Sequence, residues 1–583
     1  MAAFSPPLLV PILAVLLATA ATTQCHTDKH HGHAAKAALA PPATVHAICH
    51  TTPNPASCLA SAAVHLDAAH IAASSVSVTI LPGNILSVLL ASLRSALTAV
   101  SSLSPVLSST LSAPPSPSST PLRRGAAQDC LELHAATLES LSRSTSLLTS
   151  PGESLPAVRA HLSAALTNKA TCLDGLAGAS GPRMDGLLSS LDDAYEHVSN
   201  SLSLVARQGT GGPASSSFQA TVAKIIHHNR RLLQDEEEDD DSDDNSGGGD
   251  DDNSGNDKDH NGNGDESGET VITVAKDGSG NFRTVGEAVA AAPSRSDART
   301  VIKVKAGTYE ENVEVPADKT NIALVGEGRD VTVITGSRSA ADGWTTFRTA
   351  TVGVSGEGFL ARDIAFRNTA GAARGQAVAL RVNADMAAVY RCAVEGHQDS
   401  LYAHSFRQFY RECAVSGTVD VVFGNAAAVL QACALVAGNP VPGQSNVLTA
   451  HSRSDPAQDT GFAVHSCTVE ASPELLASAV STRTFLGRPW GAYARSVVIE
   501  SHLGPLVDRA GWTGWPGAEE GRSDTVYFGE YGNDGPGART DGRVGWAGYH
   551  EMEYDEAAQF AVDKFIYGDD WLGATSFPYD DGI

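Results

Sequence analysis

Gln376, Asp399 and Asp420 are polar residues of the C-terminal half whose spacing could bring them together. They are separated by 23 and 21 residues, and side chains at matching points of a solenoid with that repeat stack about 4.8 Å apart. Two carboxyl groups this close cannot easily both ionise, so one keeps its proton and the pair offers a nucleophile or base beside an acid. A neighbouring amide could donate a hydrogen bond to an oxyanion. The spacing does not say which aspartate has which role, and aspartates that merely cap solenoid turns are the alternative.

The segments that must position these residues are short and strand-like. From residue 270 onward, runs such as VIKV (301–304), FLARDIAF (359–366) and VDVVFG (419–424) alternate with Gly, Asn and Asp. Comparable positions recur about every 20–25 residues, and helix-period segments between them are scarce. This pattern predicts an all-β domain folded as a right-handed parallel β-helix, in which each coil stacks on the one before.

The cysteines give a second indication of stacking. Nine are present, four in each half besides Cys25, and none forms a C-x-x-C pair. Even counts suit disulfides in an oxidising compartment rather than a zinc site. Cys392 and Cys413 are 21 residues apart, and adjacent coils would bring their Cα atoms near the roughly 5.5 Å that a disulfide needs. We therefore predict a Cys392–Cys413 bridge and expect a second one, Cys433–Cys467.

The N-terminal half has a different character. Residues 41–206 are rich in Ala, Leu and Ser, and stretches such as ILSVLLASLRSALTAV (85–100) place apolar residues at helical intervals. The pattern predicts an all-α bundle of four or more helices. Because this half lacks a dense cluster of catalytic residue types, a binding or inhibitory role is expected for it.

Charge separates the two halves. The formal net charge is −26, which argues against nucleic acid as a partner. Residues 235–269 alone carry a net charge of −16 with almost no apolar residues, so they cannot form a core and are expected to be a solvated linker. The dibasic pair Arg230–Arg231 precedes this run and predicts an accessible protease site.

The N-terminus predicts export. An apolar run from Leu8 to Ala18 is followed by small residues, as in a secretory signal peptide, and it is too short to span a membrane. No later stretch is a convincing span. The His-rich segment that follows the leader could bind metal, but a flexible segment is the preferred interpretation. The expected division of the chain is a signal peptide (1–21), a flexible segment (22–40), a helical domain (41–206), a processing site with acidic linker (207–269) and a β-helix (270–583).

Five motifs then narrow the chemistry. GTYEE (307–311), GQAVALRV (375–382), GHQDSLY (396–402), GTVDVVFGNAA (417–427) and LGRPW (486–490) occur in this order. Together they resemble the plant pectin methylesterases, carbohydrate esterases that act on methylated galacturonan. The resemblance extends from about Val271 to Pro578. It implies a pectinesterase that requires no cofactor and no metal.

The resemblance also implies roles for individual residues. Asp399 matches the family's general acid and base, and Asp420 matches its nucleophile. Gln376 and Gln398 match the residues that stabilise the oxyanion.

Substrate contacts follow from the same comparison. Arg488 and Trp490 match the family's substrate-binding Arg and Trp, and Thr346 matches a further substrate contact. Trp512 is a weaker candidate for the face on which a sugar ring stacks.

The helical half resembles the pectin methylesterase inhibitor family. That resemblance implies a four-helix bundle with the bridges Cys49–Cys58 and Cys130–Cys172. The whole arrangement is similar to plant pectinesterases made as pro-enzymes and processed at a basic motif followed by Leu-Leu, here at Arg230–Arg231, for which a subtilisin-like protease is the expected partner.

The expected protein is thus a secreted monomer of the plant cell wall (the apoplast). It would hydrolyse methyl esters of homogalacturonan with two aspartates, and the helical domain would act as an autoinhibitory pro-region. Two alternatives stay open at this point. One is a pectin lyase or glycosidase on the same solenoid, and the other is a non-enzymatic inhibitor or binding protein.

Overall fold

The computed structural model covers two folded regions of the chain. The residues it describes are 43–66, 83–112, 122–149, 154–178, 180, 182–207, 270–478, 481–517 and 522–583. The expected leader, the His-rich segment, the dibasic site Arg230–Arg231 and nearly all of the acidic linker lie outside these residues.

The first region is helical. Its elements are α1 (Ala43–Cys49), α2 (Pro55–His65), α4 (Gly83–Leu111), α5 (Ala126–Thr149), α6 (Leu155–Leu176) and α7 (Pro182–Ala206). The four long helices α4 to α7 share one apolar core that includes Leu93, Leu141, Leu162 and Leu187. By length and composition alone Ile85–Leu111 could cross a membrane. Its buried side chains pack inside the bundle, as in the core helix of a folded domain.

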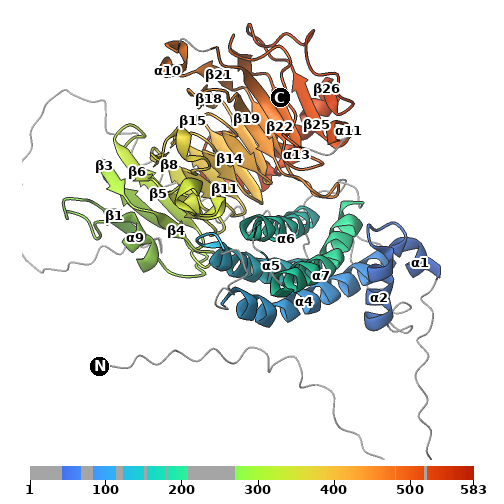
Figure 1. The fold of residues 1–583 in the computed structure, drawn as a ribbon. Coiled ribbons are helices and arrows are strands. Elements are labelled where there is room, and N and C mark those ends of the chain that lie inside the picture. Colours follow the sequence, from blue (N-terminus) through green and yellow to red (C-terminus); the bar gives the residue numbers. More distant parts are fainter. Residues whose placement is uncertain are drawn as a thin grey trace, which may run out of the picture. The chain divides into compact units, whose positions relative to one another are not determined.

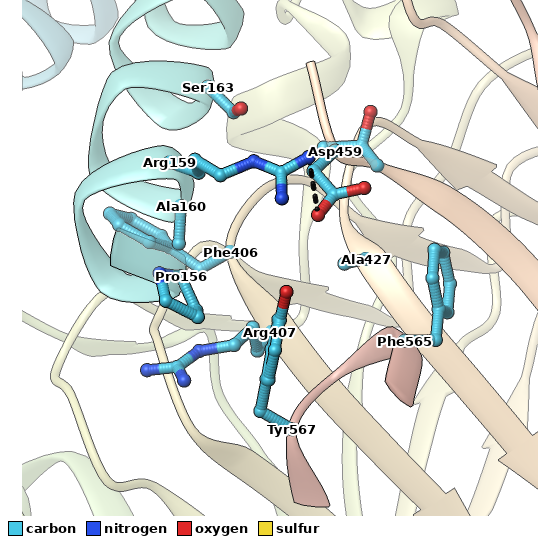
Figure 2. Close-up of a pocket in the computed structure, with 11 residues that line it drawn as sticks. Pro156, Arg159, Ala160, Ser163, Phe406, Arg407, Ala427, Asp459, Phe565 and Tyr567 are labelled. Atoms are coloured by element: carbon cyan, nitrogen blue, oxygen red, sulfur yellow. Dashed lines mark ion pairs between the residues drawn. The ribbon is translucent and has the colours of Figure 1, made fainter. Parts of the chain in front are cut away.

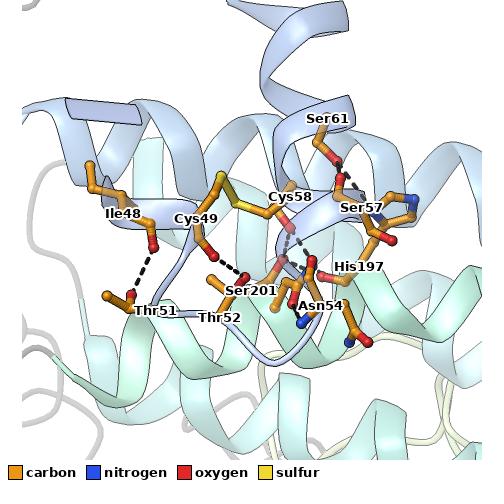
Figure 3. Close-up of a disulfide and its surroundings, with 12 residues drawn as sticks. Ile48, Cys49, Thr51, Thr52, Asn54, Ser57, Cys58, Ser61, His197 and Ser201 are labelled. Carbon is orange, nitrogen blue, oxygen red and sulfur yellow. Dashed lines mark hydrogen bonds between the residues drawn. A yellow bond between two sulfur atoms is a disulfide. The ribbon is translucent and has the colours of Figure 1, made fainter. Parts of the chain in front are cut away.

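Two disulfides stabilise the bundle, and both confirm the expected pairing. Cys49–Cys58 closes the turn between α1 and α2, and Cys130–Cys172 joins α5 to α6. Around the first bridge, the side chain of Asn200 on α7 accepts a hydrogen bond from the backbone N–H of Asn54 and donates one to its carbonyl (Figure 3). These bonds attach the disulfide loop to α7.

The second region is a parallel β-helix of three sheets. The eleven-stranded sheet contains β1 (Thr270–Val274), β2 (Thr300–Val304), β5 (Ile322–Gly326), β8 (Leu360–Arg362), β11 (Ala387–Tyr390), β14 (Arg407–Arg411), β17 (Ala427–Gln431), β20 (Gly461–His465), β23 (Arg495–Ile499), β25 (Tyr527–Tyr531) and β26 (Tyr549–Glu551). The seven-stranded sheet contains β22 (Thr484–Pro489), β19 (Asn446–His451), β16 (Val422–Gly424), β13 (Leu401–Ala403), β10 (Leu380–Val382), β7 (Val352–Val354) and β4 (Val313–Val315). The eight-stranded sheet contains β24 (His502–Leu503), β21 (Thr468–Ala471), β18 (Ala434–Ala437), β15 (Ala414–Gly417), β12 (Ala393–Glu395), β9 (Ala365–Asn368), β6 (Thr332–Gly336) and β3 (Gly307–Glu310).

Short helices complete the β-helix. They are α9 (Val285–Ala291), η1 (Ala340–Asp342), η2 (Thr346–Thr349), η3 (Ala372–Arg374), α10 (Pro473–Leu476), α11 (Arg522–Thr525), α12 (Tyr554–Ala557), η4 (Ala558–Phe560), α13 (Val562–Phe565), η5 (Gly568–Asp570) and η6 (Leu572–Ala574). Along the chain each coil contributes a strand to successive sheets, and the coils follow one another from green to red (Figure 1). The C-terminal helices pack apolar side chains such as Phe565 and Trp571 against Val429 and Phe409 of the eleven-stranded sheet.

The cysteines of the β-helix form a ladder of free thiols, so the predicted bridges Cys392–Cys413 and Cys433–Cys467 are wrong. The four residues occupy the same point of successive coils, each one residue before β12, β15, β18 and β21. In a parallel in-register stack the Cβ atoms point the same way and stay about 4.8 Å apart, whereas a disulfide needs roughly 3.8 Å. A suitable Cα–Cα distance alone therefore does not predict a disulfide between stacked coils.

Single residues turn the chain between the eleven-stranded and eight-stranded sheets in a left-handed conformation. They are Asp363, Arg391, Glu412, Ala432, Ser466 and Glu500, with φ between 46° and 57°. Such a φ costs a residue with a side chain about 1–2 kcal/mol. The fold repeats this strained turn because only two residues separate the strands of one sheet from those of the next, and the first of the two must reverse the direction of the chain.

Replacing Ala432 by Gly tests that strain. Because Gly adopts a positive φ freely, we expect Ala432→Gly to leave the free energy of unfolding unchanged or to raise it by up to about 1 kcal/mol. Ala428→Gly, in the regular strand β17, should instead lower it by about 1 kcal/mol or more. Denaturant unfolding of both variants makes the comparison, and equal destabilisation would contradict a strained turn.

Candidate active site

Asp399 and Asp420 lie on adjacent coils, as their spacing predicted. Each stands two residues before a strand of the seven-stranded sheet, and those strands pair Leu401 with Val422. The backbone N–H of Asp399 donates to the carbonyl of Val419, 3.0 Å away. Both aspartates have a positive φ, of 66° and 55°, and both are buried. The turn that precedes each strand thus presents one carboxyl group on the same face of the sheet.

Gln376 departs from the predicted stacking. The pairing of Leu380 with Leu401 aligns Asp399 with Val378, so that Gln376 lies two residues away from the expected position. Gln398 lies beside it, because the backbone N–H of Ala377 donates to the Gln398 carbonyl over 3.1 Å. The two glutamines are half-buried neighbours on successive coils, although the amide does not stack in line with the carboxyl groups.

Arg488 on β22 holds Asp420. Its Nε and Nη2 donate to the two carboxylate oxygens over 2.8 and 2.6 Å, a bidentate arrangement. The contact spans β19, since Phe423 pairs with Ala450 and Ala450 with Arg488. Charge-assisted bonds of this kind are strong and fix the carboxylate in one orientation.

The surroundings act differently on the pKa values of the two carboxyl groups. Burial raises the pKa of Asp399 well above its ordinary value, and the charge of Asp420 raises it further. Burial also raises the pKa of Asp420, but the hydrogen bonds and charge of Arg488 oppose that rise. Of the two groups, Asp399 is therefore the one on which a shared proton is favoured, and Asp420 is the one whose ionised form Arg488 stabilises. A buried acid beside an oriented carboxylate can perform acid–base and nucleophilic chemistry.

Helix α6 contacts the coils that carry this pair. Ser163, Thr167 and Thr171 are spaced one helical turn apart along α6. Gln458 donates to the Ser163 carbonyl over 3.1 Å, and Asn425 donates to the Thr167 hydroxyl over 2.9 Å.

The third contact of α6 joins the Thr171 hydroxyl to Nε2 of His404, 2.9 Å away. Gln458, Asn425 and His404 follow β19, β16 and β13, which are neighbours in the seven-stranded sheet. Successive turns of α6 thus bind successive coils.

A small cavity remains where α6 meets the β-helix. Its volume is about 20 Å³, which is room for one water molecule. The ion pair between Arg159 and Asp459, 3.0 Å long, crosses it (Figure 2). The residues that line the cavity include neither catalytic candidate, so it is part of the contact and not the reactive site.

Comparison with known proteins agrees with this geometry. Residues 271–569 match the family described as Pectinesterase, and residues 43–204 match the family described as Plant invertase/pectin methylesterase inhibitor. The chain belongs to the pectinesterase family. It is therefore a carboxylic ester hydrolase that carries an inhibitor-like helical domain.

Individual relatives cover much of the chain. A probable pectinesterase/pectinesterase inhibitor 12 of Arabidopsis thaliana is 45% identical over 549 residues, which span 92% of this chain and 93% of that protein. Pectinesterase 2.1 of Solanum lycopersicum is 41% identical over 79% of this chain and 78% of its own. The solved pectin methylesterase from carrot is 50% identical, with a TM-score of 0.53, and the match covers 54% of this chain and 98% of that one.

The pectinesterase site contains an aromatic row that the sequence only partly indicated. Tyr402 stacks on Phe423 with ring centroids 4.1 Å apart, and Phe423 lies 6.0 Å from Trp490. Trp490 stacks in turn on Trp515 at 6.2 Å, and the Arg488 guanidinium lies 4.3 Å from the Trp515 ring. Trp490 thus lies in a row of aromatic rings beside Arg488, and its role as a sugar-binding face stays a prediction.

Trp512 is not such a face, so that weaker expectation is wrong. It is only 1% exposed, and its ring nitrogen donates to Glu530 inside the core. Trp515, three residues later, is the half-buried ring beside Arg488. Thr346 begins η2 next to Phe347, at the far end of the aromatic row, where Phe347 lies 6.5 Å from Tyr402.

Asparagine substitutions test the shared proton through stability. Asn tolerates a positive φ, so neither change adds backbone strain. At pH 7, Asp399→Asn replaces a protonated carboxyl by an isosteric amide and should change the free energy of unfolding by less than about 0.5 kcal/mol. Asp420→Asn leaves Arg488 without its counter-ion and should lower it by about 2 kcal/mol. Denaturant unfolding compares the two variants, and a larger loss for Asp399→Asn would reverse the assignment.

Proposed function

We propose that this chain is made as an inactive pectin methylesterase that hydrolyses the methyl esters of homogalacturonan by means of Asp420 and Asp399. The observation that carries the proposal is the Arg488-bound carboxyl group of Asp420 beside the buried carboxyl group of Asp399 on the adjacent coil, whose pKa burial raises. The inhibitor-like domain would keep the enzyme inactive until it is released.

The first half of the reaction forms an acyl-enzyme. Asp420 attacks the carbonyl carbon of the ester, and the carbonyl oxygen becomes an oxyanion. The amides of Gln376 and Gln398 are the donors for that oxyanion, and each such donor typically contributes about 3 kcal/mol. Asp399 gives its proton to the methoxy group, which leaves as methanol.

The second half restores the enzyme. Asp399, now a carboxylate, takes a proton from water, and the resulting hydroxide attacks the acyl carbon. Asp420 leaves as a carboxylate and the sugar acid is released. Arg488 orients Asp420 for both steps, while Trp490, Trp515 and Thr346 would contact the polymer.

The cellular setting belongs to the same proposal. The signal-like leader would direct secretion to the plant cell wall, and a subtilisin-like protease would cut at Arg230–Arg231. The mature enzyme would act as a monomer.

Methanol release tests the activity. The chain cut after Arg231 and freed of its helical domain should release methanol from methylated pectin without shortening the polymer, which a lyase or a glycosidase would do. Asp420→Asn should abolish turnover, and Asp399→Asn should slow it by about 10²–10⁴-fold. Asp297→Asn, at an exposed carboxyl of the β-helix, serves as the mutation control and should leave turnover unchanged. A rate for Asp420→Asn within tenfold of wild type would place the nucleophile elsewhere.

Autoinhibition is supported by the direction of α6. A helix rises about 6 Å over four residues, and parallel coils repeat every 4.8 Å. Contacts from Ser163, Thr167 and Thr171 can therefore follow the axis of the β-helix across three coils. These coils carry Asp399 and Asp420, so a docked α6 lies where the polymer must bind.

An intact-chain variant tests this blockade. Thr171→Arg places a long charged side chain against buried His404, so it should loosen α6 and raise the activity of the uncut chain at least several-fold. Ser101→Arg adds the same side chain at an exposed position of α4 and should leave the uncut chain as inactive as wild type. If Thr171→Arg also stays inactive while its helical domain detaches in a binding assay, the domain does not block the site.

Docking should also respond to pH. The charge of Asp174 on α6 raises the pKa of Asp399, and burial raises the pKa of Asp174 itself, against the charge of Arg123. These two carboxyl groups therefore bind more protons in the docked form. Burial acts in the opposite direction on two imidazoles of the same contact, because it lowers the pKa of His161 on α6 to about 4 and that of His404 to about 3. Above about pH 7, where an ordinary imidazole is already neutral, the carboxyl contribution acts alone, and docking weakens as the pH rises through the raised pKa values.

The affinity of the two domains in the cut chain measures this linkage. We expect it to fall as the pH rises above about 7, by at most about tenfold per pH unit for each proton released. Asp174→Asn should flatten the dependence, whereas Asp193→Asn on the exposed side of α7 should not. An affinity that rises with pH would contradict the assigned direction.

A further inference from the structure

Two arginines lie at the end of the aromatic row away from Arg488. Arg381 belongs to β10, next to the strand that follows Asp399, and Arg348 belongs to η2. Arg348 is 5% exposed and Arg381 is completely buried. The Phe347 ring connects them, with the Arg381 guanidinium 3.4 Å and the Arg348 guanidinium 5.5 Å from its centroid.

Three carboxylates surround this pair, and two of them belong to the helical domain. Arg348 donates through Nε to Asp129 over 2.8 Å and through Nη2 to Glu132 over 2.7 Å. Glu314 on β4 accepts from Arg348 at 3.3 Å and from Arg381 at 2.7 Å. These three carboxylates raise the pKa of Arg348 above its ordinary value.

The β-helix is built to hold these arginines together. Glu314, Gly353 and Arg381 are aligned on the neighbouring strands β4, β7 and β10. A Cβ at Gly353 would collide with Nη2 of Arg381 and with Oε2 of Glu314. The glycine lets the ion pair cross the strand between its partners, so this charge arrangement exists within the β-helix and does not need α5.

Removing the helical domain changes the charge balance of the cluster. When the helical domain is docked, the two guanidinium groups face the three carboxylates Asp129, Glu132 and Glu314. When the domain is removed, only Glu314 remains, and the cluster has two positive charges against one negative charge. Nε and Nη1 of Arg381 have no hydrogen-bond partner among the described residues even when the domain is docked. Arg348 then loses the acceptors of its Nε and Nη2, and a planar guanidinium with free donors beside an aromatic ring is suited to a carboxylate on a ring-shaped ligand.

We propose that Arg348, supported by Arg381, is a subsite for the free carboxylate of an already de-esterified galacturonate, and that Asp129 and Glu132 occupy this subsite in the uncut chain. The inference rests on the proposed esterase function and deepens it, because it gives the mature enzyme a preference for partly de-esterified polymer. From strand spacing and residue rise, the subsite lies on the order of 10–15 Å from the reacting pair, so it binds a different sugar from the one that reacts.

Two hexasaccharide substrates test the preference. One is hexagalacturonate with every carboxyl methylated, and the other has about half its carboxyls free. The cut, separated β-helix is a suitable enzyme form, since the match to the carrot protein covers 98% of that chain but only 54% of this one. We expect wild type to have the higher kcat/KM per ester on the partly free substrate. Arg348→Gln should lower the ratio of kcat/KM on the partly free substrate to kcat/KM on the fully methylated one about tenfold. The change should appear in KM, since a charge-assisted hydrogen bond to the free carboxylate is lost.

Matched variants separate binding from folding. Arg348→Lys keeps the positive charge but lacks the planar, two-pronged guanidinium, so it should recover part of the substrate preference. Arg509→Gln changes an exposed arginine paired with Asp541 and should keep the wild-type preference. Equal kcat/KM values for the two substrates in wild type, or a ratio unchanged in Arg348→Gln, would overturn the subsite. If Arg348→Gln does not fold, the wild-type comparison and Arg348→Lys decide. Failure of wild type to release methanol from either hexasaccharide would refute the esterase function instead.

Discussion

In-register stacking of parallel coils is the constraint on which the site depends. Strand spacing brings Asp399 against Asp420, and both carboxyl groups are held in place because each residue has a left-handed backbone two residues before a paired strand. Arg488, two strands from Asp420, then stabilises the ionised form of one member of the pair. The asymmetry between the two carboxyl groups is thus produced by one guanidinium on an otherwise repetitive scaffold.

The same repeat gives the inhibitor-like domain its means of attachment. A helix laid along the solenoid axis meets one coil per turn, as Thr167 and Thr171 do. At one end of the contact α5 contributes Asp129 and Glu132, so the inhibitor-like domain presents carboxylates to a surface that, in the proposed function, generates carboxylates. Helix and polymer would compete for one face because both follow its axis and both can carry negative charge.

The sequence predicted what depends on the repeat and failed where side-chain direction matters. The 21-residue interval correctly paired Asp399 with Asp420, since such an interval is one coil. It misplaced Gln376, because strand pairing and not the spacing of polar residues sets the register. It also suggested a Cys392–Cys413 bridge, because interval and Cα distance do not tell which way Cβ points. Arg348 was missed because its importance arises from α5, more than 200 residues earlier in the chain.

The central claim is that one proton is shared by the pair and lies on Asp399. Carbon-13 NMR of the full chain labelled at the aspartate side-chain carboxyl carbon measures this directly at pH 6–7, far above the ordinary aspartate pKa of about 3.9. The account predicts a protonated-carboxyl signal that disappears in Asp399→Asn and persists, at a higher pH, in Arg488→Gln. A spectrum without any signal from a protonated aspartate in this pH range, or one whose signal survives Asp399→Asn and is lost in Asp420→Asn, would contradict it.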